Sequence, residues 1–208
     1  MRKIAESTVR RLSLYLRFLE EFETQGAETV SSEALATRGG TTSAQVRKDL
    51  SFFGSFGKRG LGYQVPALKS ELQEILGLTR RYRVIVIGAG KIGSALVQYG
   101  GFRARGFDLV SIYDNDPRKI GKQWDALVVR AVAQLEKDLK EHPADIAAIV
   151  TPAESAQPVA DRLVQCGVTA ILNFAPAQLQ VPEHVTVKTV NLVLELEALS
   201  YILGASDR

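Results

Sequence analysis

The stretch SAQVRKDLSFFGSFGKRGLGY occupies residues 43–63 and joins a short amphipathic pattern to a glycine-rich basic segment. In its first part, Val46, Leu50 and Phe53 recur at the i, i+4 and i+7 spacing of one helical face. The glycines from Gly54 onward exclude a continuing helix, so we predict a β-hairpin with two adjacent cations at its tip. A helix followed directly by such a hairpin is typical of the recognition helix and wing of a winged-helix DNA-binding domain.

The helical face opposite the apolar stripe carries polar and basic side chains. Arginine can bond both acceptors of a guanine in the major groove, and lysine can contact a base or a phosphate. We therefore expect Arg47 and Lys48 to make the principal contacts, while the hairpin enters a minor groove, where a narrow A·T-rich tract attracts arginine. The predicted DNA-binding residues are Ser43, Gln45, Arg47, Lys48, Ser51, Lys58, Arg59 and Gly60.

The flanking residues complete a helix-turn-helix pattern. Apolar side chains recur at helical spacing within residues 9–22, and Ser7 or Thr8 is the expected N-cap of that helix. Ser31 is expected to open a second, shorter helix, which a turn connects to the third. After the hairpin, apolar residues within 68–76 predict an amphipathic linker helix.

Basic residues are concentrated in the same part of the chain. Six basic residues and a single acidic one, Asp49, lie between Arg38 and Lys69 inclusive. Such a patch is the electrostatic footprint of a nucleic-acid contact, and the alternative interpretation is a solvated charged surface. We predict that residues 1–80 form the DNA-binding domain.

A second motif begins with VIVIGAGKIG, residues 84–93, in which a β-branched strand runs into a GxGxxG pattern that opens a helix. In this context the pattern predicts binding of a dinucleotide pyrophosphate at the helix N-terminus. Gly88 would make the tight turn, and Gly90 would let the backbone approach the pyrophosphate. Gly93 would permit close packing of helix and strand.

The next predicted strand, Leu109–Tyr113, ends in Asp114, where an acidic residue hydrogen-bonds the adenosine ribose. A carboxylate there repels the 2′-phosphate of NADP, so NAD(H) is the expected cofactor, although Arg118 and Lys119 lie nearby. The predicted cofactor-binding residues are Gly88, Ala89, Gly90, Lys91, Ile92, Gly93, Asp114, Thr151, Pro152, Asn173, Phe174 and Ala175.

Strands and helices alternate through the rest of this region. Further strands are predicted at Ile146–Val150, Thr169–Phe174 and Val185–Val190, and Gly121–Arg130 is interpreted as a loop. Residues 81–190 are therefore expected to form a Rossmann-type doubly wound parallel sheet, which makes the whole chain an α/β protein with an N-terminal winged-helix domain.

The last segment, residues 191–208, contains a helix that is apolar on almost every side between Leu192 and Leu203. A helix of this kind is buried all round, either in its own domain or in a partner. The segment is therefore a candidate dimerisation helix.

Three segments resemble the Rex family of redox-sensing transcriptional repressors: QVRKDLSFFGSFGKRGLGY (45–63), TPAESAQ (151–157) and LNFAP (172–176). The resemblance covers essentially the whole chain. It implies a homodimer that exchanges its C-terminal helix between subunits, binds palindromic operator DNA when NADH is scarce, and releases the DNA when NADH binds. It also implies that Phe174 and Tyr99 sense the nicotinamide end and that Arg17 couples the domains.

The chain departs from the family pattern at one position. The family commonly has an Asp at the start of the C-terminal helix, which pairs with an N-terminal Arg or with the tyrosine after the glycine motif. Asn191 stands there in this chain, and it can hydrogen-bond but cannot form an ion pair. The switch residues expected from the resemblance are thus Arg17, Tyr99 and Asn191, and the alternative is a paralogue with a weak or absent NADH response.

Two further hypotheses belong to other classes of protein. An NAD-dependent dehydrogenase would need a substrate domain and a general acid or base, but His142 and His184 are expected in surface loops, so we predict no catalytic residues. A DNA-binding protein whose nucleotide domain only dimerises would bind no dinucleotide. Because Cys166 is the single cysteine, the sequence excludes an intrachain disulfide and a metal site made of a cysteine cluster. With neither a signal peptide nor a membrane span in the sequence, we expect a cytoplasmic protein.

Overall fold

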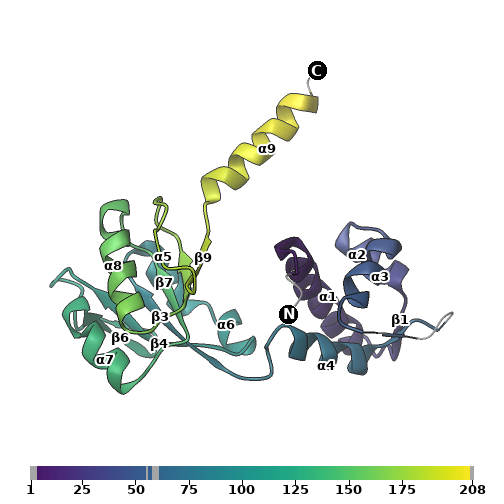
Figure 1. The fold of residues 1–208 in the computed structure, drawn as a ribbon, viewed down its shortest axis with the longest axis horizontal. Helices are drawn as coiled ribbons and strands as arrows, with labels where there is room; N and C mark the ends of the chain where they lie inside the picture. Colours follow the sequence, from purple (N-terminus) through teal and green to yellow (C-terminus); the bar gives the residue numbers. More distant parts are fainter. Residues whose placement is uncertain (1–3, 55, 58–60, 207–208) are drawn as a thin grey trace. The chain divides into compact units, whose positions relative to one another are not determined.

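The protein is described by a computed structural model covering residues 4–54, 56–57 and 61–206. The residues divide into two compact units, Met1–Arg80 and Arg81–Arg208 (Figure 1). Three of the predicted DNA-binding residues, Lys58, Arg59 and Gly60, lie outside the described residues.

The N-terminal unit contains four helices and a small antiparallel pair of strands within its described part. In chain order these are α1 (Glu6–Thr24), β1 (Thr29–Val30), α2 (Ser32–Gly39), α3 (Ser43–Ser51), β2 (Tyr63–Gln64) and α4 (Val65–Ile75). Thr29 lies opposite Gln64 in the pair, so the glycine-rich segment returns to the strand that precedes α2. This is the arrangement of a winged helix.

Local capping explains where the two short helices begin. The Ser31 hydroxyl accepts a hydrogen bond from the N–H of Ala34 (3.0 Å), and the Thr42 hydroxyl accepts one from the N–H of Gln45 (3.1 Å). The predicted cap of the first helix is wrong: Ala5 is the N-cap residue, with no side-chain bond, and Ser7 and Thr8 lie inside the helix.

The core of this unit is built on α1, which buries Leu12, Leu16 and Leu19. Against them pack residues of α3 and, from α4, Leu68 and Leu72. The fourth helix is therefore part of the N-terminal core and not a linker, because its apolar stripe completes the packing that three short helices cannot.

The second unit is built on a seven-stranded sheet with the order β5-β6-β4-β3-β7-β8-β9. The strands are β3 (Tyr82–Ile87), β4 (Phe107–Asp114), β5 (Gln123–Trp124), β6 (Leu127–Ala131), β7 (Ile146–Ile149), β8 (Ala170–Asn173) and β9 (Thr186–Thr189). All neighbours are parallel except β5 and β6. Setting β5 aside, this is the strand order of a doubly wound dinucleotide-binding domain, and the order reverses between β3 and β7.

Helices cover both faces of the sheet. The helices of this unit are α5 (Lys91–Gln98), α6 (Gly101–Ala104), the 3-10 turn η1 (Val132–Gln134), α7 (Leu135–Glu141), α8 (Ala153–Gln165) and α9 (Leu192–Ser206). Alternate residues of β3 point to opposite faces, so Ile85 and Ile87 pack with α7 and α8 while Val86 packs with Val97 of α5.

The prediction of a loop at Gly121–Arg130 is wrong. The segment contains β5 and most of β6, and β6 extends the parallel sheet by pairing Val129 with Ile112 of β4. Only Val129 of β6 is fully buried, because this edge of the sheet is thinly covered. The segment therefore lacks the continuous apolar run by which a strand of a parallel sheet is usually recognised.

The C-terminal helix α9 leaves its apolar side chains exposed in this chain. The exposed residues are Leu192, Val193, Leu194, Leu196, Leu199, Tyr201, Ile202 and Leu203. The alternative in which this helix is buried in its own domain is therefore wrong. The alternative that is left is burial against a partner. Within the described ranges, no helix is both long and apolar enough to cross a membrane.

Replacement of Leu72 by alanine tests whether α4 belongs to the N-terminal core. Since Leu72 is fully buried, Leu72→Ala should lower the free energy of unfolding of this unit by about 2–5 kcal/mol. The measurement is urea denaturation followed by circular dichroism. The control is Val9→Ala, which truncates a side chain that is 41% exposed. If α4 were only a linker outside the core, the Leu72→Ala and Val9→Ala variants would have the same free energy of unfolding.

Candidate functional site

The outer face of α3 presents the polar residues that the sequence predicts for DNA contact. Arg47, Lys48 and Ser51 are exposed, and Ser43 is half-buried. The Arg47 guanidinium donates a hydrogen bond to the hydroxyl of Ser32 at the start of α2 (3.1 Å). That contact directs the side chain along the surface that α2 and α3 share, where it remains accessible.

The inner face of α3 holds a buried carboxylate that the sequence analysis counted only as a charge. Asp49 is fully buried, and it accepts hydrogen bonds from Arg11 Nε (2.6 Å) and Arg11 Nη2 (2.7 Å). Tyr15 donates its hydroxyl proton (3.0 Å) and Gln45 its side-chain amide (2.8 Å) to the same carboxylate. The network anchors α3 to α1, and it turns the side chain of Gln45, a predicted DNA contact, toward Asp49.

Hydrogen bonding keeps Asp49 ionised. Burial raises the pKa of this carboxyl, but the hydrogen bonds from Arg11, Gln45 and Tyr15 outweigh burial and hold the pKa below its ordinary value. Burial and the contact with Asp49 raise the pKa of Tyr15, so its hydroxyl remains a donor. A signal for this site was present in the sequence, since Asp49 stands three residues after Val46 on the apolar face.

At two positions of the segment after α3, another part of the backbone lies so close that only glycine fits. Gly57 has φ +84°, and a Cβ atom there would lie 2.6 Å from the carbonyl oxygen of Gly62. Gly62 has φ +80°, and a Cβ atom on it would collide with the carbonyl of Val30 in β1. The two ends of the segment are therefore drawn together, as a tight hairpin requires.

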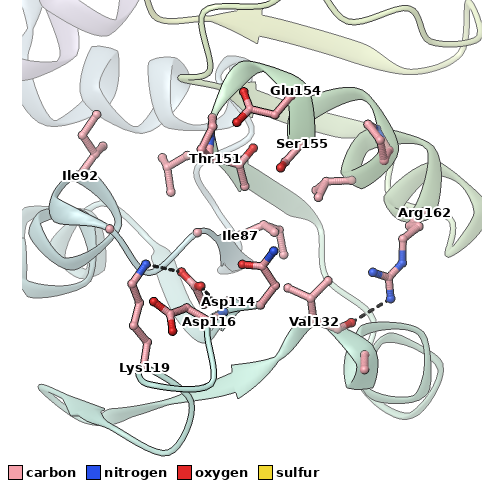
Figure 2. A pocket seen from close by; sticks show the side chains of 18 of the residues that line it. Ile87, Ile92, Asp114, Asp116, Lys119, Val132, Thr151, Glu154, Ser155 and Arg162 are labelled. Atoms are coloured by element: carbon pink, nitrogen blue, oxygen red, sulfur yellow. Dashed lines mark hydrogen bonds and ion pairs between the residues drawn. The ribbon is translucent and has the colours of Figure 1, made fainter.

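A large cavity opens at the carboxyl ends of β3, β4 and β7 in the second unit. Its volume is about 1110 Å³, and Figure 2 shows lining side chains that come from α5, from the turn after β4 and from the start of α8. Ile87 pairs with both Tyr113 and Ile149, so the three strands end at the same edge of the sheet, at the point where the strand order reverses. Ligands of doubly wound sheets bind at this position.

The structure brings together part of the predicted cofactor site. The predicted residues that line the cavity are Gly88, Gly90, Lys91, Ile92, Asp114, Thr151 and Pro152. Those that do not line it are Ala89, Gly93, Asn173, Phe174 and Ala175. Lining residues that the sequence analysis missed include Asn115, Asp116, Lys119, Val132, Ser155 and Arg162. Val132 was missed because it follows β6, which the sequence analysis interpreted as a loop.

The glycines of the GxGxxG turn occupy three different environments. Gly88 has φ +112°, and a Cβ atom on it would lie 2.7 Å from the carbonyl oxygen of Val150. A Cβ atom on Gly93 would collide with the carbonyl of Gly88, so the start of α5 packs directly on the turn. Within the described part of the chain, a Cβ atom on Gly90 would meet no atom within 4 Å, which leaves open space beside the helix N-terminus.

Asp114 is held at the end of β4 by donors from three directions. Its Oδ2 accepts from the N–H of Ala89 (2.7 Å) and from the ammonium of Lys119 (3.1 Å), while its Oδ1 accepts from the N–H of Asp116 (2.8 Å). Burial raises the pKa of this carboxyl, but these donors lower it more, so the net pKa lies below its ordinary value. Asp114 is therefore an anion at neutral pH.

The two loops that follow β7 and β8 differ in what they offer to a ligand. The hydroxyl oxygen of Thr151 is buried beside the cavity and has no hydrogen-bond partner among the residues that the structure describes. Asn173 is fully buried, accepts from the N–H of Ala175 (3.0 Å) and donates to the carbonyl of Ala177 (2.8 Å). The side chain of Asn173 thus stabilises the loop that follows it. The hydroxyl of Thr151 is still able to form a hydrogen bond with a ligand.

The predicted switch residues lie at exposed or capping positions. Tyr99 is 61% exposed and packs edge-to-face on Phe102, with ring centroids 5.0 Å apart. Arg17 is exposed on α1, 3.6 Å from the carboxylate of Glu21. Asn191 Oδ1 accepts a hydrogen bond from the N–H of Val193 (3.0 Å) at the start of α9.

The remaining titratable candidates are surface groups. His142 and His184 are both exposed, as predicted. Among the described residues, no three His, Cys, Asp or Glu side chains are grouped so that they could hold a metal ion.

Comparison with known proteins assigns each unit a counterpart. A family model described as "Putative DNA-binding protein N-terminus" matches residues 3–51, and one described as "CoA binding domain" matches residues 79–177. "Redox-sensing transcriptional repressor Rex" of Carboxydothermus hydrogenoformans is 49% identical and is aligned over 96% of both chains. The protein of the same name from Streptomyces coelicolor is 46% identical, over 96% of this chain and 78% of its own.

Two solved structures match over the full length of the chain. The first is RSP in complex with β-NAD⁺ and operator DNA, with a TM-score of 0.94, 38% identity and coverage of 100% of this chain and 95% of RSP. The second is RSP in complex with β-NADH, with a TM-score of 0.90, 36% identity and coverage of 100% and 97%.

Replacement of Asp49 by asparagine tests the buried network. Because Asp49→Asn leaves Arg11, which is 26% exposed, without its counter-charge, we expect a loss of about 3 kcal/mol in unfolding free energy at pH 7. The folded pKa is the lower one, so the stabilisation is present above the unfolded pKa of about 3.9 and is lost as the pH falls through the folded value.

The measurement is urea denaturation of both proteins between about pH 3 and pH 8. The stability difference should be constant above about pH 5 and shrink below about pH 4. Glu33→Gln, which neutralises an exposed carboxylate of the same unit, is the control. A difference that stays constant down to pH 3 would show that Asp49 gains no stability from its charge.

Proposed function

The chain belongs to the Rex family of redox-sensing transcriptional repressors, and from that membership we propose that it binds palindromic operator DNA as a homodimer and releases the DNA when NADH binds. One observation carries the proposal: a single chain holds both a helix with exposed basic side chains and a glycine-bounded cavity at the switch point of a Rossmann sheet. The named relatives and solved structures combine the same two units.

In the proposed complex, α3 enters a major groove of the operator. The contacts are made by the exposed Arg47 and Lys48, with Ser43 and Ser51 at the edges of the helix. Gln45 contributes less directly than the sequence suggested, because its amide is bonded to Asp49. The remaining proposed contacts, to a minor groove, are those of Lys58, Arg59 and Gly60.

In the proposed cofactor site, the cavity accommodates a dinucleotide. The open space at Gly90 and the N–H groups that begin α5 suit a pyrophosphate, and the unpartnered hydroxyl of Thr151 offers a further hydrogen bond. Asp114 suits the hydroxyls of the adenosine ribose. Asn173, at the end of β8, and the following Phe174 and Ala175 would act from outside the lining of this cavity. When bound, NADH supplies the free energy that favours the state without DNA.

The proposed homodimer explains the exposed helix α9. Water contact with so many large apolar side chains is unfavourable by roughly 25 cal/mol for each Å² that a partner could cover. A two-fold dimer also matches a palindromic operator, because each half-site then receives one recognition helix. We therefore propose that α9 is the dimerisation element of residues 191–208, exchanged between subunits.

A second candidate function follows from Asn191. Its side chain caps α9 through Val193 and carries no charge, so an ion pair at this position is impossible. A repressor that binds operator DNA and a dinucleotide but responds weakly to NADH remains the alternative, with Arg17 and Tyr99 as the other switch residues.

The dehydrogenase hypothesis loses its support, since the full-length relatives are named as repressors. A repressor must reach its operator, so we propose a cytoplasmic location.

Operator binding measured with and without cofactor tests the function. Fluorescence anisotropy with a palindromic A·T-rich duplex at fixed salt should show about a tenfold or larger loss of affinity with NADH and little change with NAD⁺. The matched variants are Arg47→Ala, which should weaken binding by about tenfold or more, and Arg10→Ala, an exposed arginine of α1 that should not. Tight binding that ignores both cofactors would favour the weakly responding repressor.

Alanine at Gly90 tests the cofactor site. Gly90 has φ −92° and ψ −167°, which alanine adopts readily, so Gly90→Ala should fold normally and bind NADH about tenfold or more weakly. In Gly93→Ala the new methyl group would collide with the Gly88 carbonyl, so this variant should lose thermal stability instead. Thermal melts and NADH fluorescence titrations measure both effects. Unchanged NADH affinity in Gly90→Ala would exclude the open space as the pyrophosphate site.

A further inference from the structure

Lys119 lies at the same carboxylate that is proposed to bind the adenosine ribose. It lies in the turn after β4, lines the cavity, and brings its ammonium 3.1 Å from Asp114 Oδ2 (Figure 2). The side chain of Asp114 is only 7% exposed, whereas that of Lys119 is 35% exposed. Lys119 is therefore the solvent-facing member of a pair whose acid is fixed in the wall of the cavity.

The carboxylate of Asp114 has few acceptor positions left for a ligand. A carboxylate offers about four lone-pair directions. Three donors already use Asp114: the N–H of Ala89, the N–H of Asp116 and the ammonium of Lys119. The two backbone donors are fixed by the glycine turn and by the turn after β4. A ribose that donates two hydroxyl protons to Asp114 must therefore displace Lys119.

The same ammonium changes how the cavity receives a phosphate. An isolated carboxylate at the end of the second strand repels the 2′-phosphate of NADP(H). Here the ammonium of Lys119 compensates the charge of Asp114 and, once displaced, can pair with a phosphate. Lys119 thus acts against the ribose hydroxyls and in favour of the phosphate.

The neighbouring cation, Arg118, does not share this position. Its guanidinium is 87% exposed, does not line the cavity, and is bonded to Asp116 through both Nε (3.0 Å) and Nη2 (2.9 Å). Adjacent residues with the same charge therefore differ in whether they face the cavity, which provides a matched pair for experiment.

We propose that Lys119 sets the selectivity of this pocket between unphosphorylated and 2′-phosphorylated dinucleotides, by competing with ribose hydroxyls for Asp114 and by supplying the cation that a 2′-phosphate requires. The proposal rests on the proposed function of the cavity as a dinucleotide site. Its consequence is a pocket that prefers NADH over NADPH less strongly than Asp114 alone would dictate.

The test is the ratio of dissociation constants for NADPH and NADH, measured by fluorescence titration of the full chain at fixed pH and salt. Both ligands are anions, so loss of any nearby cation weakens both, and only the ratio reports on the 2′ position. Lys119→Ala should raise the ratio about tenfold, the loss expected for one charge-assisted hydrogen bond. Arg118→Ala should leave the ratio within about twofold.

Three results would overturn the inference. An unchanged ratio in Lys119→Ala, in a protein with wild-type thermal stability and measurable NADH binding, would show that Lys119 does not act at the 2′ position. An equal rise in Arg118→Ala would assign the effect to net charge. Failure of the wild-type chain to bind either dinucleotide would remove the cofactor function itself, and this result is distinguishable from the other two.

Discussion

The close approach of Gly93 to the carbonyl of Gly88 is the constraint on which the second unit depends. Because no side chain separates them, α5 begins directly on the end of β3 and directs its N-terminus into the edge where β4 and β7 also end. Any larger residue at Gly93 would move the helix off the turn and close the space beside Gly90. The fold and the cavity thus rest on the same backbone contact.

The parts of the fold that sequence predicts well are those set by local rules. The periodicity of α1 and α3, the cap Ser31, and the strand–glycine–helix pattern at residues 84–93 can be recognised because each depends on residues close together in the chain. The edge strands β5 and β6 were missed, since strand pairing at a thinly covered edge leaves little apolar pattern.

The site was predictable only in part, because its chemistry is assembled from distant segments. Asp49 was legible as a charge, but its partners Arg11 and Tyr15 lie on another helix, 38 and 34 residues away. Asp114 was predicted from its place at the end of the second strand, yet the hydrogen bond that leaves few of its acceptor positions free depends on the turn that carries Lys119. In both units a buried carboxylate also receives donors from a distant segment, Arg11 and Tyr15 for Asp49 and the N–H of Ala89 for Asp114.

The exposed apolar side chains of α9 bear on how the stability of the chain depends on its concentration. If a second subunit covers this helix, the stability of the chain rises with its own concentration, by mass action. A copy without a partner keeps these apolar side chains in water, and exposed apolar surface is a feature that chaperones and proteases recognise in incompletely assembled proteins. If α9 is covered in this way, the paired form is the more stable one, and its share grows as the chain accumulates.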